Sequence, residues 1–137
     1  MAIIKPLTDT VCVAPQVRPE ELAELKAQGF TLIINNRPDG EEPGQPTSKE
    51  MHAAADAAGL KYAHVPVGHG ISPSDVAEMQ EALGTCGEGK TLAFCRSGTR
   101  STMLWAIACS EQGTPREELE AAAEGAGYSL APVNHLL

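Results

Sequence analysis

Residues 90–101 read KTLAFCRSGTRS, and this stretch decides the fold. The apolar run before Cys95 predicts a short buried strand that ends at this thiol. From Arg100 onward, apolar residues recur on one face as far as Cys109, which predicts a helix. A strand that passes through a turn at Gly98 into a helix is typical of α/β proteins.

The rest of the chain alternates strands and helices in the same way. Helix starts carry capping residues or a first-turn proline, and glycines follow the helix ends. This alternation predicts an α/β fold, with a mainly parallel central sheet and helices on both faces. With no linker or repeat, one domain is predicted over 1–137. Strands are predicted at 11–14, 30–35, 62–67 and 90–94, and helices at 19–29, 47–59, 72–84, 100–109 and 114–127.

Polar residues follow three of the predicted strands. Arg37, His69 and Cys95 each come directly after a strand or a few residues beyond it. The carboxyl ends of parallel strands share one edge of a sheet, and ligands of such sheets bind beyond that edge. We therefore expect these three side chains on one rim of the molecule. Pro66 marks the 62–67 strand as an edge strand, a bulge or a strand end.

The CRSGTRS loop combines a thiol with groups that bind anions. Gly98 permits a tight turn with a positive φ, so the loop amides can point inward as a nest. Together with the helix N-terminus, these amides favour the nucleophilic thiolate of Cys95. Arg100 can hold two oxygens at once. We predict catalytic roles for Cys95 and Arg100, and an anion- or substrate-binding role for Arg96, Ser97, Gly98, Thr99, Ser101 and Arg37.

Composition excludes several classes of partner. The net charge is −8, which argues against nucleic acid and anionic membranes, because both require a basic face. Residues 1–5 lack the apolar region of a leader peptide, and no apolar run reaches membrane-spanning length. The four cysteines show neither CxxC nor zinc spacing. We expect a cytoplasmic protein with reduced thiols, no metal and no cofactor.

Two further residues each have two interpretations. Arg37 either has a functional role, as a second contact for the bound anion or as an anchor that pairs with Glu41 or Glu42 to shape the wall of the site, or it forms a loop salt bridge of little energy. Cys86 lies in a predicted turn and is either a structural residue or a second thiol that resolves an oxidised Cys95.

A family resemblance adds to these interpretations. CRSGTRS closely resembles the active-site loop of single-domain rhodaneses, which are sulfurtransferases, and less closely the loop of tyrosine and dual-specificity phosphatases. Together with GFTLIINNRPDGEE and AGLKYAHVPV, it resembles a bacterial family described as phosphatase-like or sulfurtransferase-like. The resemblance runs from about Ile4 to Gln112 and implies a dual-specificity-phosphatase-like fold. Because the family also occurs fused to persulfide dioxygenases of metallo-β-lactamase fold, it implies such a dioxygenase as a partner.

The resemblance leaves the reaction open between sulfur transfer and phosphate hydrolysis. The loop between Cys95 and Arg100 is one residue shorter than in the phosphatases, and a persulfide needs less room than a phosphate. We therefore favour a sulfurtransferase that moves sulfane sulfur from thiosulfate or a persulfide to an acceptor through a Cys95 persulfide. The alternatives are a phosphatase that forms a phosphocysteine, and a non-catalytic or redox-sensing thiol module.

A phosphatase needs an acid to protonate its leaving oxygen, whereas sulfite leaves as a stable anion. Asp39 and Asp75 are the candidate acids, with Glu41 and Glu42 close to the first. Asp75 also fits the first turn of a helix, where a carboxylate is favourable. The predicted substrate is in either case a small anion: thiosulfate, a persulfide or a phosphoester.

Overall fold

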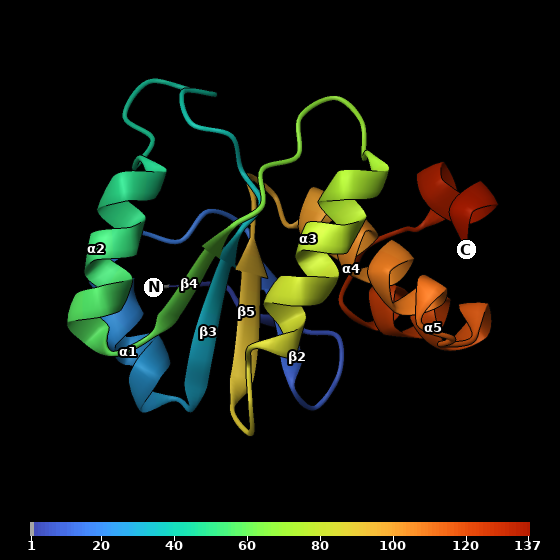
Figure 1. Cartoon of the computed structure of the whole chain (residues 1–137), viewed down its shortest axis with the longest axis horizontal. Coiled ribbons are helices and arrows are strands. Elements are labelled where there is room, and N and C mark those ends of the chain that lie inside the picture. The colour runs from blue at the N-terminus through green and yellow to red at the C-terminus, as the bar shows by residue number, and fades with distance from the viewer. Residues whose placement is uncertain (1) are drawn as a thin grey trace.

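A five-stranded sheet forms the centre of the molecule (Figure 1). The computed structural model describes residues 2–137, so Met1, the first residue of the segment examined for a leader, lies outside the described residues. The strand order is β1-β2-β5-β3-β4, with β1 antiparallel to β2 and the other pairs parallel. The strands are β1 Lys5–Pro6, β2 Val11–Ala14, β3 Phe30–Asn35, β4 Lys61–His64 and β5 Lys90–Phe94.

Helices cover both faces of this sheet (Figure 1). Helices α1 and α2 pack on one face and share a core with the side chains of Leu22, Ile33 and Met51. Helices α3, α4 and α5 pack on the other face, around Ile34, Met79 and Leu104. The predicted α/β fold with a mainly parallel sheet is therefore confirmed. The helices are η1 Pro19–Glu21, α1 Leu22–Ala27, α2 Ser48–Ala58, α3 Pro73–Gly84, α4 Thr99–Glu111, α5 Arg116–Gly125 and η2 Ala131–Leu136.

Two of the predicted helix starts are confirmed by their capping contacts. The Thr47 side chain accepts a hydrogen bond from the Glu50 amide, and the Glu50 carboxylate reaches back to the Thr47 amide at the start of α2. Ser72 and Asp75 form the same reciprocal pair at the start of α3. These capping boxes satisfy amides that would otherwise lack a partner in the first turn.

Strand β5 is the central strand and brings Cys95 to the rim. Phe94, its last residue, pairs with Ala14 of β2 on one side and with Asn35 of β3 on the other. Because β3, β4 and β5 are parallel, their carboxyl ends lie together along the upper edge in Figure 1. The N-termini of α2 and α3 lie along the same edge. The loops that follow β3, β4 and β5 therefore meet at one edge of the sheet, as the sequence predicted.

The structure departs from the sequence prediction in three places. Strand β4 ends at His64, two residues before Pro66, which lacks the amide needed to continue the ladder. β1 was not predicted, because two residues carry no periodic signal. The chain end forms the 3-10 helix η2, where no helix was predicted. Within residues 2–137, no helix has the length and apolar character that crossing a membrane requires.

Candidate active site around Cys95

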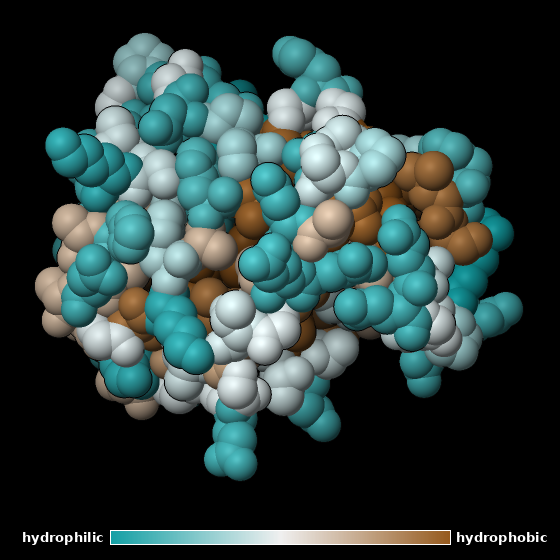
Figure 2. All heavy atoms as spheres, in the orientation of Figure 1, coloured by the Kyte–Doolittle hydropathy of each residue, from teal (hydrophilic) through white to brown (hydrophobic). Residues whose placement is uncertain are grey.

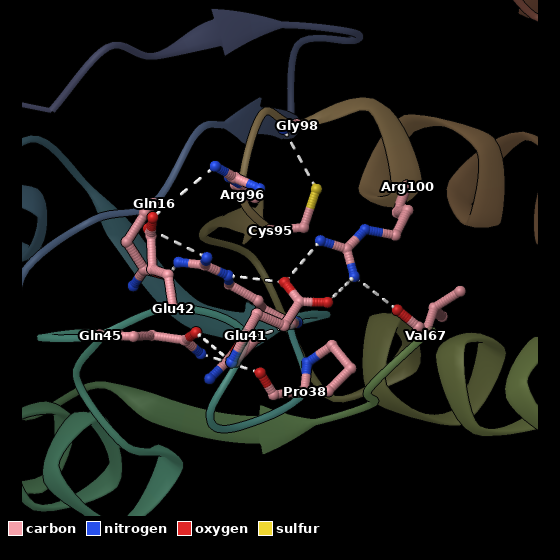
Figure 3. Close-up of polar contacts among 12 residues, drawn as sticks. Gln16, Pro38, Glu41, Glu42, Gln45, Val67, Cys95, Arg96, Gly98 and Arg100 are labelled. Atoms are coloured by element: carbon pink, nitrogen blue, oxygen red, sulfur yellow. Dashed lines mark hydrogen bonds and ion pairs between the residues drawn. The ribbon is translucent and has the colours of Figure 1, made fainter. Parts of the chain in front are cut away.

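Cys95 lies between the end of β5 and the start of α4. The backbone at Gly98 has φ 93°, in the left-handed region, and Gly98 caps the N-terminus of α4. This turn aims the Gly98 amide at the Cys95 sulfur, and N–H donates to Sγ at an N···S distance of 3.1 Å (Figure 3). A backbone donor and a helix N-terminus both stabilise negative charge on this sulfur. The predicted turn is therefore present, with one of its amides directed at the thiol, and its binding of an anion stays a prediction.

Three contacts hold the Cys95 loop in this shape. Tyr128, which follows α5, donates its hydroxyl to the Ser97 carbonyl at 2.8 Å. The Thr102 hydroxyl donates to the Gly98 carbonyl at 2.8 Å, and the Gln16 amide donates to the Arg96 carbonyl at 3.3 Å. All three partners lie outside the CRSGTRS motif: Gln16 lies between β2 and η1, Thr102 lies in α4, and Tyr128 follows α5. Sequence reasoning missed Tyr128 and Gln16, because the motif itself gives no signal for the segments that support it.

Tyr128 lies close enough to the thiol to respond to its charge. Burial raises the pKa of the Tyr128 hydroxyl, and the negative charge of Cys95 raises it further. A neutral phenol therefore remains beside the loop through the ordinary pH range, where it keeps donating to the Ser97 carbonyl. This contact fixes the loop against the segment after α5.

The guanidinium of Arg100 forms a bidentate contact with a carboxylate. Guanidinium groups bind oxyanions with the same geometry. Nη1 and Nη2 donate to the two oxygens of Glu41 at 2.7 and 2.8 Å, and Nη1 also donates to the Val67 carbonyl at 2.7 Å (Figure 3). The remaining two N–H groups, on Nε and Nη2, lie on the neighbouring edge of the guanidinium, where an oxyanion could form a second fork. The hydrogen bonds to Glu41 raise the pKa of Arg100, and nearby Cys95 raises it further.

Arg37 is fully buried and anchors the wall of the site. Its Nε donates to Glu41 at 2.8 Å, its Nη2 to Glu42 at 3.0 Å and its Nη1 to Gln16 at 3.0 Å. Of the interpretations of this residue, the structure gives the anchor that pairs with both glutamates. A buried guanidinium needs such partners, because an uncompensated buried charge is strongly destabilising.

Glu41 therefore bridges two arginines, and its pKa is low. The hydrogen bonds from Arg100 and then from Arg37 lower the pKa of this carboxyl from 4.5 to about 2. At neutral pH Glu41 is an anion with no proton to donate, so it cannot serve as a general acid in this position. Its carboxylate instead holds the Arg100 side chain beside the Cys95 loop (Figure 3).

The hydroxyls of the loop fall into two groups. Ser97 donates to the Thr99 hydroxyl at 3.0 Å, and both side chains lie on the rim of the loop. Ser101, in contrast, is fully buried and donates to the Asn36 side chain at 2.7 Å, while Asn36 donates to the Val65 carbonyl at 3.0 Å. The predicted anion-binding role of Ser101 is therefore corrected: this hydroxyl ties α4 to the ends of β3 and β4.

The remaining predicted residues lie further from the thiol or on the outside. Arg96 is two-thirds exposed and approaches Glu42 at 3.7 Å, so it lies on the rim. The Asp39 carboxylate accepts the Ser48 amide at 2.8 Å at the start of α2, and Asp75 accepts the Ser72 amide at 2.9 Å. Within residues 2–137, neither carboxylate hydrogen-bonds to the Cys95 loop. Both act as helix-capping groups here, and their role as acids stays a prediction.

The other cysteines are distant from this chemistry in structure and environment. Cys86 lies before the start of β5, where its sulfur is 3.4 Å from the Thr31 hydroxyl, so the length of the strand separates it from Cys95. Burial raises the pKa of both Cys12 and Cys109, which favours their neutral thiols. Among residues 2–137, no group of three or more His, Cys, Asp or Glu side chains is placed to hold a metal ion.

Replacing Gly98 by alanine is expected to distort the loop. A Cβ at this position would overlap the Tyr128 hydroxyl and come within 2.9 Å of its ring carbon Cζ, and the backbone φ of 93° disfavours alanine in any case. We expect a loss of about 2 kcal/mol in the free energy of unfolding, measured by urea denaturation. Activity is expected to fall about 100-fold, because the donor to Sγ moves.

Gly113→Ala is the matched control for this change. Gly113 has a similar φ of 101°, but a Cβ there would meet nothing within 4 Å. This variant is expected to lose about 1 kcal/mol of stability from backbone strain and to keep its activity. Equal losses of activity in the two variants would contradict the proposed role of the Gly98 turn.

The low pKa of Glu41 predicts a specific dependence of stability on pH. Because the pKa is lower in the folded than in the unfolded chain, the contribution of Glu41 is fully present above about pH 4.5 and is lost as the pH falls towards 2. Because Glu41 is partly exposed and solvent screens its ion pairs, the wild type is expected to lose only about 1 kcal/mol more than Glu41→Gln over this range, measured by urea unfolding at a series of pH values. Parallel pH profiles of the two proteins would contradict the ion-pair bridge.

Residues 4–113 match the family described as "Beta-lactamase hydrolase-like protein, phosphatase-like domain". The chain belongs to this family. The match covers β1 Lys5–Pro6 through the whole of α4 Thr99–Glu111, and so includes the Cys95 loop and the residues that support Arg100. Membership confirms the phosphatase-like part of the resemblance, whereas the rhodanese-like part is not shown.

Two longer relatives of this phosphatase-like family are 35–39% identical to the chain over the aligned residues. A beta-lactamase hydrolase-like protein of Xylella fastidiosa is 39% identical over 126 residues, which is 90% of this chain and 29% of the relative. A protein of the same description from Agrobacterium fabrum is 35% identical over 133 residues, or 96% of this chain and 31% of the relative. The chain thus spans about three tenths of the length of these relatives.

Solved structures confirm the phosphatase-like fold of this family member. A presumed phosphatase of Neisseria meningitidis Z2491 has a TM-score of 0.83 and 29% identity, with 98% of both chains covered. The protein Tk-PTP in its active form has a TM-score of 0.70 and 20% identity, covering 90% of this chain and 84% of that one. Kinase-associated phosphatase has a TM-score of 0.71 and 19% identity, covering 99% and 91%. The last two show the fold alone.

Proposed function

We propose that this chain is a cysteine-dependent enzyme in which the Cys95 thiolate attacks a small anionic substrate and carries the transferred group. One observation supports this above all: the Gly98 amide donates to Cys95 Sγ at the N-terminus of α4. A structural thiol has no need of such a donor, whereas a nucleophile or its bound anion does.

The finer form that we propose is transfer of sulfane sulfur. Its first support is the short loop, in which four residues lie between Cys95 and Arg100 and leave less room than a phosphate needs. Its second support is the state of the nearby carboxyl groups. Asp39 caps a helix and Glu41 remains ionised to about pH 2, so neither is set up to protonate a leaving oxygen.

The reaction has two displacement steps and needs no external redox partner. The Cys95 thiolate attacks the outer sulfur of thiosulfate; a new S–S bond forms, the original S–S bond breaks, and its electron pair leaves with sulfite. An acceptor thiolate or cyanide then attacks the outer sulfur of the Cys95 persulfide. The bond to Cys95 breaks, its electron pair returns to the cysteine sulfur, and the thiolate is regenerated.

The surrounding residues take positioning and binding roles in this scheme. The Gly98 amide stabilises the negative charge on the persulfide sulfur. Arg100, held by Glu41 and the Val67 carbonyl, uses its second edge to orient the sulfonate oxygens of the donor. Ser97 and Thr99 offer hydroxyl donors at the rim, and Arg96 lies outside them as an exposed cation. Because Cys95 is fully buried, substrate entry requires that a covering side chain moves aside.

Phosphate ester hydrolysis is the second candidate, and the comparisons favour it. The family description and the Neisseria structure both carry the word phosphatase, and no relative described above is called a sulfurtransferase. In this candidate Cys95 attacks phosphorus, the ester oxygen leaves, and water hydrolyses the phosphocysteine. This reaction requires a proton donor for the leaving oxygen. Asp39 and Asp75 accept backbone amides at helix starts and Glu41 is ionised, so none of the three carboxyl groups is placed to supply that proton.

Two assays on one preparation separate these candidates. The first measures transfer of sulfur from thiosulfate to cyanide, and the second measures hydrolysis of an aryl phosphate. We expect thiocyanate formation and little phosphate release. The reverse result would replace the proposed sulfur transfer by the phosphatase. If neither activity is detected, a non-catalytic or redox-sensing thiol is the remaining function.

We also propose a persulfide dioxygenase as partner, which the family resemblance implies. The proposal rests on chemistry: a thiol acceptor leaves the reaction as a thiol persulfide, and such dioxygenases consume persulfides. Adding the chain and thiosulfate to a persulfide dioxygenase with its thiol is expected to start oxygen uptake, measured with an oxygen electrode. Equal uptake without the chain would contradict this partnership.

A further inference from the structure

A groove of about 340 Å³ lies directly beside Arg100. It is formed by the loop after β4, by the first turns of α4 and by the C-terminal 3-10 helix η2. Figure 2 shows hydrophobic surface over the C-terminal end of the chain, at the upper right of the view. The lining residues are Val67, Gly68, His69, Gly70, Ile71, Arg100, Met103, Pro132, Val133, His135 and Leu136.

The groove has no acidic side chain in its lining among residues 2–137, although the protein as a whole is acidic, with 18 acidic residues. Its polar side chains are Arg100 and the imidazoles of His69 and His135, and the remaining walls are mainly aliphatic. A ligand with an apolar body and an anionic end therefore fits the lining by its charge as well as by its hydrophobicity.

Leu136 gives a second reason to expect an occupant. It is 46% exposed, and Ile3 is the only other large hydrophobic side chain that is exposed among residues 2–137. Leu136 lines the groove, whereas Ile3 lines neither this groove nor the loop at Cys95. Covering Leu136 with an apolar group would remove hydrocarbon from water and favour binding.

Arg100 connects the groove with the Cys95 loop. It is a residue of the CRSGTRS motif, it lines the groove, and its Nη1 donates to the Val67 carbonyl in the groove wall. A substrate whose anionic end is held by the second edge of Arg100 would therefore extend its organic part along the Val67 wall. Inorganic thiosulfate has no such part and leaves the groove empty.

We propose that the groove binds the aliphatic group of an organic persulfide, which the enzyme uses as a sulfur donor in addition to thiosulfate. This inference rests on the proposed sulfur transfer. The Cys95 thiolate attacks the outer sulfur of the persulfide R–S–S⁻, the S–S bond breaks, and its electron pair leaves with the thiolate R–S⁻, which takes a proton from water. The groove thereby distinguishes an organic donor from thiosulfate.

Alkyl thiosulfonates of increasing chain length are stable probes for this groove. They deliver their outer sulfur to Cys95 and release an alkyl sulfinate. We expect KM to fall about two- to fourfold for each added methylene from methyl to pentyl, as hydrocarbon enters the groove. Turnover of inorganic thiosulfate provides the reference that depends on the Cys95 loop alone.

Leu136→Ser is the variant that tests the groove, and Ile3→Ser is its matched control. Both residues are exposed, so neither change is expected to unfold the protein. Leu136→Ser is expected to flatten the dependence of KM on chain length and to leave the KM for thiosulfate unchanged. Ile3→Ser is expected to behave as the wild type with every donor.

Binding of unreactive alkyl sulfonates, measured by calorimetry, separates failure of this inference from failure of the proposed function. If thiosulfate is turned over but chain length has no effect on KM, the groove proposal is overturned while sulfur transfer stands. If no donor is turned over but sulfonates bind more tightly with chain length, and Leu136→Ser removes this trend, the groove stands as a site for apolar anions and sulfur transfer fails. If neither turnover nor binding is observed, both are overturned.

Discussion

Cys95→Ser is expected to abolish the activity of this protein, with a loss of at least about 1,000-fold in kcat/KM. The serine hydroxyl is far less acidic than the thiol, and a single amide donor from Gly98 does not ionise it at neutral pH. Because the side chain is nearly isosteric, the loop is expected to keep its shape. The measurement is the rate of sulfur transfer from thiosulfate to cyanide, together with urea unfolding to establish that the fold persists.

Cys86→Ser is the control for this experiment. Cys86 is a partly buried thiol at the opposite end of β5, so its replacement changes the number of thiols without changing the site. It is expected to retain wild-type activity. If Cys95→Ser retained more than a tenth of the wild-type rate, or if Cys86→Ser lost as much, Cys95 would not be the nucleophile.

Arg100→Lys is expected to have the second largest effect, a loss of about 100- to 1,000-fold in kcat/KM. A lysine keeps the charge but cannot hold the two Glu41 oxygens and the Val67 carbonyl while presenting a second pair of donors to an oxyanion. The substitution therefore loses both the position of the positive charge and the paired N–H donors of the guanidinium. Steady-state kinetics with thiosulfate measure this effect.

Arg96→Lys is the matched substitution within the same loop. The Arg96 guanidinium is two-thirds exposed, and its distance to Glu42 is 3.7 Å, so an ammonium group can replace it with little change. We expect less than about a threefold loss of activity. A larger loss for Arg96→Lys than for Arg100→Lys would exchange the roles that we assign to the two arginines.

Much of the fold was predictable because its signals are local. The capping pair of Thr47 and Glu50 and the proline start at Pro73 fixed two helices from a few neighbouring residues. The apolar run before Cys95 and the glycine after it predicted the strand, the turn and the helix that build the site. The single-domain organisation over 1–137 stays a prediction.

The partners of the site residues were less predictable, because they depend on contacts between distant segments. Ser101 belongs to the motif by sequence, but the helix turns its hydroxyl away from the thiol towards Asn36. Asp39 and Asp75 were candidate acids by proximity in sequence, yet each one meets a backbone amide at a helix start. Tyr128 is 31 residues from Ser97, and no periodic pattern links them.

The balance of charge around Arg100 also emerged only from the structure. Arg37 and Arg100 share Glu41, and Glu42 adds a second carboxylate within reach of Arg37 and Arg96. Two glutamates thus offset most of the charge of three arginines. An organic persulfide, which carries a single negative charge, suits this balance better than a dianion such as thiosulfate or a phosphate monoester, which would meet two carboxylates near the loop.

The central claim is that the Cys95 sulfur itself carries the transferred atom. Mass spectrometry of the intact protein after incubation with thiosulfate tests it most directly. We expect the mass of the wild type to rise by one sulfur atom, peptide mapping to locate the added atom on Cys95, and cyanide to remove it. A wild-type protein with unchanged mass under conditions that support turnover, or a sulfur adduct that persists in Cys95→Ser, would contradict the account.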